Sequence, residues 1–238
     1  MAPDARLLDA VRAALRAAAD PQRAPAMQDY MKSTMPFLGV PRPAFTAALR
    51  PVWAAHPPRD RATWEDSVRA LWDDAAAREE RYAALALLSA RPARGWHDSG
   101  LVPLLEHLAV TGAWWDLVDD VASHHVAPLH RADPDALAPV LRRWSVADDL
   151  WLRRAAILGQ LGSGAGTDRD LLREVIAANL PGSAYGGEFF VRKAIGWALR
   201  DLAHRDPDWV RAYLAEQGQA LSPLSRREAG RHLAAAPS

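Results

Sequence analysis

The sequence contains no cysteine among its 238 residues, which excludes disulfides, thiolate zinc sites, iron–sulfur clusters and cysteine nucleophiles. It also lacks an apolar run approaching the roughly 20 residues that cross a bilayer. Residues 1–20 carry charges every few positions, unlike the apolar centre of a signal peptide. We therefore expect a cytoplasmic protein with no membrane partner.

Neither sign of charge dominates, since 29 Lys and Arg side chains balance 29 Asp and Glu side chains. No global positive field therefore indicates a nucleic-acid partner. The basic side chains are almost all arginine, because only Lys32 and Lys193 are lysines, and a G+C-rich genome accounts for that bias. The ten tryptophans, against four phenylalanines and four tyrosines, are more informative because indole rings suit stacking surfaces.

Helical periodicity runs through nearly the whole chain, and no segment alternates with a period of two. The pairs Asp133-Pro134, Asp206-Pro207 and Ser222-Pro223 each predict an N-cap followed by the first helical residue. The predicted helices span 4–18, 24–34, 41–55, 61–75, 78–90, 99–110, 113–125, 134–144, 148–161, 168–179, 187–204, 207–217 and 223–235.

These helices and their short connections predict an all-α fold in a single domain, residues 1–238. Consecutive antiparallel hairpins usually stack as an α-solenoid, whose concave face is a long binding surface. A compact irregular bundle is the alternative. The connections near 162–167 and 181–187 are expected to be longer than the others.

Two features that suggest a cofactor or a metal do not meet the requirements for one. The glycine-rich run that starts at Gly162 has neither a Lys-Ser/Thr pair after it nor a strand before it, as a phosphate loop requires. The pair His124-His125 lacks the spacing and the glutamate of a zinc helix. We expect no cofactor and no bound metal.

Two segments pair an aromatic side chain with a charged one on the same helix face. Trp115 and Asp119 are four residues apart and share a face, although a core tryptophan beside a solvated aspartate is the ordinary interpretation of such a pair. Trp151 and Arg154 are one turn apart, and Arg154 could simply extend its stem across an apolar surface to reach water.

A third segment places Phe190, Lys193 and Trp197 within a narrow arc of one predicted helix, with Arg200 beside them. A plain amphipathic helix would rarely place lysine on the same stripe as two aromatic rings. Basic residues concentrate here and near the C-terminus, and they could form a strip along the inner helices, although evenly mixed charge is the alternative. The two groups are Arg192, Lys193 and Arg200 with no acid in 189–200, and Arg226, Arg227 and Arg231 against Glu228.

Taken in order, the runs WWDLVD, WLRRAAIL, FFVRKAIGWALR and LSPLSRREA, with residues 25–45, carry a resemblance to a known family. From about residue 7 to residue 235 the chain is similar to the AlkD family of DNA alkylation repair glycosylases, built from HEAT-like helical repeats. The resemblance implies a monofunctional N-glycosylase that removes N3-alkyladenine and N7-alkylguanine from duplex DNA without pulling the base into a deep pocket. We expect a monomer whose partner is double-stranded DNA containing such lesions.

The resemblance also assigns roles to individual residues. It implies that Asp119 is the catalytic acidic residue and that Trp115 and Trp197 flank the lesion-bearing nucleotide. The predicted DNA-binding residues are Tyr30, Arg154, Phe190, Lys193, Arg200 and Arg227. The loop at 181–187 is longer and richer in glycine than the family pattern, which affects the expected approach of Phe189 and Phe190 to DNA.

These residue types suit the cleavage of an N-glycosidic bond. Cleavage leaves positive charge on the sugar, which a carboxylate and the faces of indole rings both stabilise. An alkylated purine that is already a cation leaves without protonation, so no general acid is required. A noncatalytic HEAT-type scaffold that binds DNA or protein is the competing interpretation, and an enzyme devoted to bulky adducts is a third possibility.

Overall fold

The computed structural model describes residues 2–233. These residues divide into two compact units, with the boundary between His97 and Asp98. Within these described residues the chain forms helices and turns and no β-strand, apart from an isolated bridge between Pro181 and Ser183. No helix there is long and apolar enough to span a bilayer.

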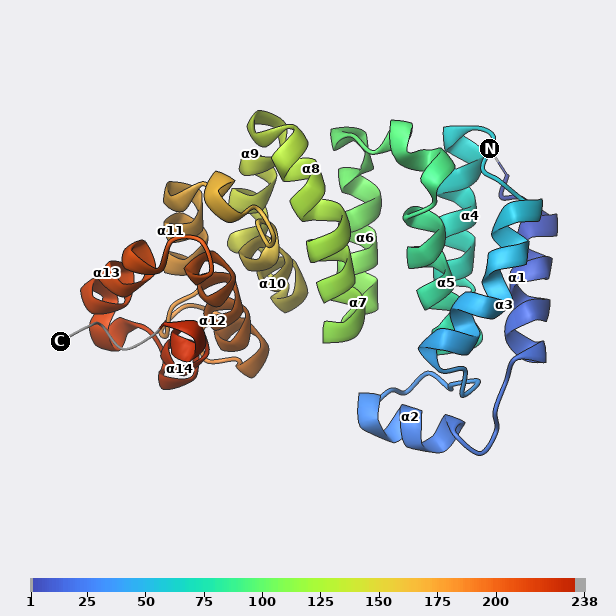
Figure 1. Ribbon diagram of the computed structural model, residues 1–238, viewed down its shortest axis with the longest axis horizontal. Helices are drawn as coiled ribbons and strands as arrows, with labels where there is room; N and C mark the ends of the chain where they lie inside the picture. The colour runs from blue at the N-terminus through green and yellow to red at the C-terminus, as the bar shows by residue number, and fades with distance from the viewer. Residues whose placement is uncertain (1, 234–238) are drawn as a thin grey trace. The chain divides into compact units, whose positions relative to one another are not determined.

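The first unit consists of five α-helices and one 3₁₀ helix, drawn from blue to green in Figure 1. Helix α4 packs against α5, and α1 packs against α3, α4 and α5. Its core includes Trp64 and Trp72, both fully buried. The elements are α1 (Ala5–Ala17), α2 (Ala24–Met31), α3 (Arg42–Ala55), α4 (Arg61–Asp73), α5 (Arg78–Leu88) and η1 (Arg91–Trp96).

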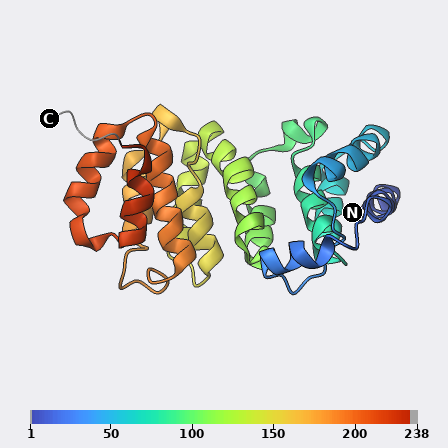
Figure 2. The same cartoon turned by 60° about the horizontal axis from the view of Figure 1, so that its bottom comes forward.

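The second unit contains the remaining helices. Helix α10 packs against α7 on one side and α12 on another, and α12 packs against α14 (Figures 1 and 2). The longer elements are α6 (Val102–Gly112), α9 (Pro134–Ser145), α10 (Leu150–Leu158), α11 (Arg169–Ala177), α12 (Phe189–Ala203) and α13 (Pro207–Gln217). The shorter ones are η2 (Ser99–Leu101), α7 (Trp115–Asp120), η3 (Val121–Val126), α8 (Ala127–Ala132), η4 (Gly164–Gly166), η5 (Gly218–Ala220), α14 (Pro223–Ala229) and η6 (Gly230–His232).

The prediction of an all-α fold built from stacked helical hairpins is confirmed within each unit. The three predicted N-caps are confirmed as well: Asp133 accepts from the Ala136 N–H at 3.1 Å, Asp206 from Trp209 at 3.2 Å, and Ser222 from Ser225 at 3.0 Å. The two predicted connections, after α10 and after α11, are the longest gaps between α-helices in the second unit. They are not longer than all others in the chain, because residues 32–41 between α2 and α3 and residues 89–101 between α5 and α6 form gaps of similar length, the latter containing η1 and η2.

One predicted boundary is wrong in an informative way. The helix expected to end at residue 125 continues through the π-helical turn η3 into α8 and ends at Ala132. The Ala127 N–H donates to the carbonyl of Ala122, five residues earlier. Pro128 has no N–H and its ring crowds the carbonyl four residues before it, so we attribute the widened turn to this proline.

Candidate active site

The centre of the candidate site is an ion pair between Asp119 on α7 and Arg154 on α10. The Arg154 guanidinium donates from Nε to Asp119 Oδ1 at 2.7 Å and from Nη2 to Oδ2 at 2.8 Å. The side chain of Arg154 is only 3% exposed and that of Asp119 is 15% exposed. Two parallel hydrogen bonds fix the plane of the carboxylate as well as its position.

The electrostatic balance at Asp119 follows from this burial. Removal from water raises the pKa of the Asp119 carboxyl above its usual value, and the hydrogen bonds and charge of Arg154 oppose that rise without cancelling it. Each carboxylate oxygen uses one lone pair on Arg154 and keeps another for a water or a positive centre. Asp119 is therefore a fixed, partly dehydrated carboxylate with unused acceptor capacity.

Arg154 also connects this pair to helix α12. Its Nη1 donates to the backbone carbonyl of Phe190, and its guanidinium carbon lies 5.8 Å from the centre of the Phe190 ring. Helix α10 thus holds the carboxylate of α7 and the first turn of α12 through one side chain. Two of the predicted DNA-binding residues, Arg154 and Phe190, are therefore in contact with each other, and Arg154 also contacts the predicted catalytic residue Asp119.

An aromatic cluster of Trp114, Trp151, Phe189 and Phe190 adjoins the pair. The centre of the Phe190 ring lies 5.0 Å from Trp151, 5.3 Å from Trp114 and 5.4 Å from Phe189, and the two tryptophan rings are 6.0 Å apart. Phe189 is half exposed at 52%. The sequence analysis assigned no site role to Trp114 or Trp151. The one-turn spacing of Trp151 and Arg154 was the sequence feature that could have placed Trp151 beside the site.

The two predicted catalytic tryptophans occupy positions outside this cluster. Trp115 is the first residue of α7, one turn before Asp119, and Trp197 lies on α12. Both indole rings are half-buried, and neither pairs with another aromatic ring within residues 2–233. Trp115, Asp119 and Trp197 all lie in the second unit, and their catalytic roles remain predictions.

The residue after Asp119 has its own partners. Asp120 accepts from exposed His124 at 3.1 Å, and its other oxygen lies 3.6 Å from Nε2 of buried His125. Burial raises the pKa of the Asp120 carboxyl, but the two histidines outweigh it and hold that pKa below its usual value. Ser123 donates to the Asp119 carbonyl at 2.6 Å. Side chains of the π-helical turn therefore contact the C-terminal end of α7. The sequence analysis considered His124 and His125 only as metal ligands.

A second charged cluster surrounds Glu228 on α14. Its carboxylate oxygens lie 2.9 Å from Lys193 Nζ, 2.8 Å from Arg200 Nη1 and 2.9 Å from Arg231 Nη2. The expectation that the basic residues of 189–200 have no acid beside them therefore holds along the chain but not in space. The acid comes from the second basic segment, because α14 packs against α12.

Two predicted DNA-binding residues remain, Tyr30 and Arg227. Tyr30 lies on α2 in the first unit and is 76% exposed. Arg227 is exposed on α14, and within the described residues it forms no ion pair. Their roles remain predictions.

The glycine-rich loop at 181–187 is attached to the body of the second unit. The Tyr185 hydroxyl donates to Asp148 Oδ1 at 3.0 Å, and the Arg153 guanidinium lies 5.1 Å from the Tyr185 ring centre. Gly186 is required by close packing, because a Cβ at this position would lie 1.9 Å from the Leu180 carbonyl oxygen. The loop therefore has a defined path into Phe189 and Phe190.

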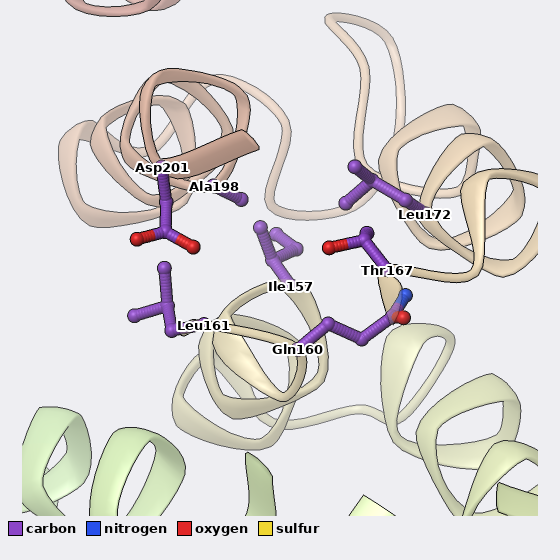
Figure 3. A pocket seen from close by; sticks show the side chains of 7 residues that line it. All are labelled: Ile157, Gln160, Leu161, Thr167, Leu172, Ala198 and Asp201. Atoms are coloured by element: carbon purple, nitrogen blue, oxygen red, sulfur yellow. The ribbon is translucent and has the colours of Figure 1, made fainter. Parts of the chain in front are cut away.

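An interior cavity of about 10 Å³ lies near α10, α11 and α12 (Figure 3). Figure 3 shows it lined by Ile157, Gln160, Leu161, Thr167, Leu172, Ala198 and Asp201. Asp201 is engaged by the Gly162 N–H at 2.9 Å, and Gln160 is engaged by the backbone of Asp168. A space of this size holds one water at most, so it is not a substrate site.

Comparison with known proteins gives a consistent result. The model of a family described as DNA alkylation repair enzyme matches residues 11–233. The chain is also similar to the structure of a predicted DNA alkylation repair enzyme from Enterococcus faecalis, with 28% sequence identity and a TM-score of 0.80 over 92% of this chain and 98% of that chain. No curated protein matches the chain significantly.

Proposed function

Because the chain belongs to the family of DNA alkylation repair enzymes, we propose that it is a DNA N-glycosylase acting on cationic alkylated purines. The substrates would be N3-alkyladenine and N7-alkylguanine in duplex DNA. The observation that carries the proposal is the Asp119 carboxylate, which Arg154 fixes through two hydrogen bonds beside an aromatic cluster.

In the proposed reaction the bond between C1′ of the sugar and the purine nitrogen breaks. The bonding electron pair goes to the purine, which was a cation and leaves as a neutral base. Positive charge develops on the sugar, and a water oxygen then bonds to C1′ and releases a proton to solvent or to Asp119. The alkyl group supplies the leaving-group activation that a general acid would otherwise provide.

Asp119 would stabilise the sugar cation electrostatically and orient the attacking water. It retains lone pairs beyond those that Arg154 occupies, and its orientation is set before DNA binds. Trp115 and Trp197 would flank the lesion-bearing nucleotide, with their negative ring faces favouring the cationic sugar. Phe190 and the basic side chains would hold the backbone, and the base would not enter a deep pocket.

The direct test is release of free base from a duplex carrying one N7-methylguanine, measured under single-turnover conditions. The matched control is the same duplex with hypoxanthine at that position, because hypoxanthine is neutral and needs activation by protonation. We expect release of the methylated base only. Efficient release of hypoxanthine would show that a group other than those above activates the base.

A duplex with a larger N7 substituent extends the test. Since the proposed site does not enclose the base, enlarging the substituent should reduce the rate less than removing the positive charge. DNA binding without release of any of these bases would contradict the proposal and favour a noncatalytic DNA-binding scaffold.

A further inference from the structure

Glu228 is a buried carboxylate that three cationic side chains share. Its side chain is 2% exposed, whereas those of Arg200, Lys193 and Arg231 are 21%, 34% and 53% exposed. One negative charge faces three positive charges, so the cluster keeps a formal charge of +2. The uncompensated charge lies on the exposed members, because the carboxylate is beneath them.

A close approach between α12 and α14 brings Glu228 next to Lys193 and Arg200. A Cβ on Gly196 would lie 2.5 Å from the Glu228 Cβ and 2.9 Å from the Ser225 carbonyl oxygen, so only glycine allows α12 and α14 to meet here. The Ser225 hydroxyl also donates to the Arg192 carbonyl at 2.8 Å. Glu228 is thereby fixed between Lys193 and Arg200, which are two helical turns apart on α12.

The donors of this cluster exceed what one carboxylate can accept. An ammonium group has three N–H donors and a guanidinium has five, while Glu228 engages one nitrogen of each partner. The remaining donors of the partly exposed side chains are available to an anion. Lys193 and Arg200 also lie on either side of Trp197 along one face of α12.

We propose that Lys193, Arg200 and Arg231 form a phosphodiester-binding site in which Glu228 is the positioning residue. The ligand would be the backbone phosphate of DNA, so the inference rests on the proposed function for the source of the phosphate. Glu228 holds three mutually repelling cations at one place before DNA arrives. Within this cluster Arg231 joins Lys193 and Arg200, the two members that the sequence analysis names as DNA-binding residues.

For the variant Glu228→Gln, the proposal and simple charge counting predict opposite changes in DNA affinity. Glu228→Gln removes a negative charge from a DNA-binding surface, and simple electrostatics therefore predicts tighter binding. If Glu228 positions the cations, its loss lets them separate and binding weakens despite the added positive charge. The matched control is Glu216→Gln, which removes an exposed carboxylate that pairs with Arg173 at 2.8 Å in the same unit.

The experiment measures the affinity of the full-length variants for an undamaged duplex over a range of salt concentrations. Arg231→Gln should weaken binding roughly tenfold at 0.1 M salt and reduce the salt slope by about one, the contribution of one phosphate contact. Glu228→Gln should weaken binding by at least that factor, while Glu216→Gln should leave it unchanged. Tighter binding by Glu228→Gln, or an unchanged slope for Arg231→Gln, overturns the proposal.

The double variant separates positioning from a purely structural role. If Glu228 acts by holding Arg231 in place, Arg231→Gln costs clearly less affinity in the Glu228→Gln background than in the wild type. Equal losses in the two backgrounds overturn the positioning role. Should Glu228→Gln fail to fold, the exposed Arg231→Gln variant decides the proposal alone through its salt slope.

These measurements are independent of base release. Loss of binding in the variants together with no base release by the wild type would refute the glycosylase and retain the phosphate site. Base release by the wild type together with unchanged DNA binding in the variants would refute the phosphate site and retain the glycosylase.

Discussion

Two carboxylates in the second unit, the partly buried Asp119 and the buried Glu228, differ in how many cations surround them. Asp119 faces one arginine, and burial raises the pKa of its carboxyl despite that partner. Burial acts in the same direction on Glu228, but Lys193 and the two arginines outweigh it and lower the pKa of that carboxyl. The pair of Asp119 with Arg154 leaves a carboxylate with unused acceptor capacity, whereas the cluster around Glu228 leaves an excess of positive charge. Burial alone therefore does not decide what a carboxylate does.

The largest expected effect comes from changing the first carboxylate. Asp119→Asn is nearly isosteric but supplies no negative charge, so single-turnover excision of N7-methylguanine should fall about 10²–10³-fold. Because Arg154 is left buried without its counter-charge, the rate is normalised to the folded fraction measured by thermal unfolding. A change of less than threefold, roughly 0.6 kcal/mol, would show that Asp119 is not the catalytic residue.

Removing the arginine instead tests how the pair contributes to stability. Arg154→Met keeps the apolar stem and should lower the free energy of unfolding at neutral pH by about 3 kcal/mol, because it leaves a buried charge unpaired. The control is Arg142→Met, which breaks an exposed pair with Glu174 and should cost at most about 1 kcal/mol. Chemical denaturation of both variants provides the comparison.

The cost of Arg154→Met should also depend on pH. A raised native pKa means that Asp119 binds its proton more tightly in the folded state, so stability falls as pH rises through the window above the unfolded pKa. Without Arg154 that pKa rises further, and protonation relieves the unpaired charge. The deficit of the variant should therefore shrink on acidification; a constant deficit would show that packing, not charge, is lost.

The smallest expected effect separates the two carboxylates by pH in the intact protein. Excision needs ionised Asp119, so its rate should fall on acidification at a pH above the ordinary aspartate range. The lowered pKa of Glu228 keeps that carboxylate ionised there, so affinity for undamaged DNA should not show this transition. Coincident transitions in rate and affinity would mean that one group controls both.

The local features of the fold could be predicted from the sequence with considerable accuracy. The N-caps Asp133, Asp206 and Ser222 were predictable because capping depends on residues within one helical turn. The π-helical turn could not be placed, because Pro128 fits either a helix start or an interruption within a longer helix. The number of tryptophans did not indicate how many indole rings are exposed for stacking, because Trp64, Trp72 and Trp144 are fully buried in the core.

The sequence by itself determined which side chains share a helix face, including Trp115 with Asp119 and the stripe from Phe190 to Arg200. Only the tertiary structure decided which faces meet: Arg154 reaches Asp119 across 35 positions of sequence, and Glu228 reaches Arg200 across 28. The physical reason is one of range. Helix periodicity fixes neighbours up to about four residues apart, whereas ion pairs between helices depend on packing details such as the contact that Gly196 allows between α12 and α14.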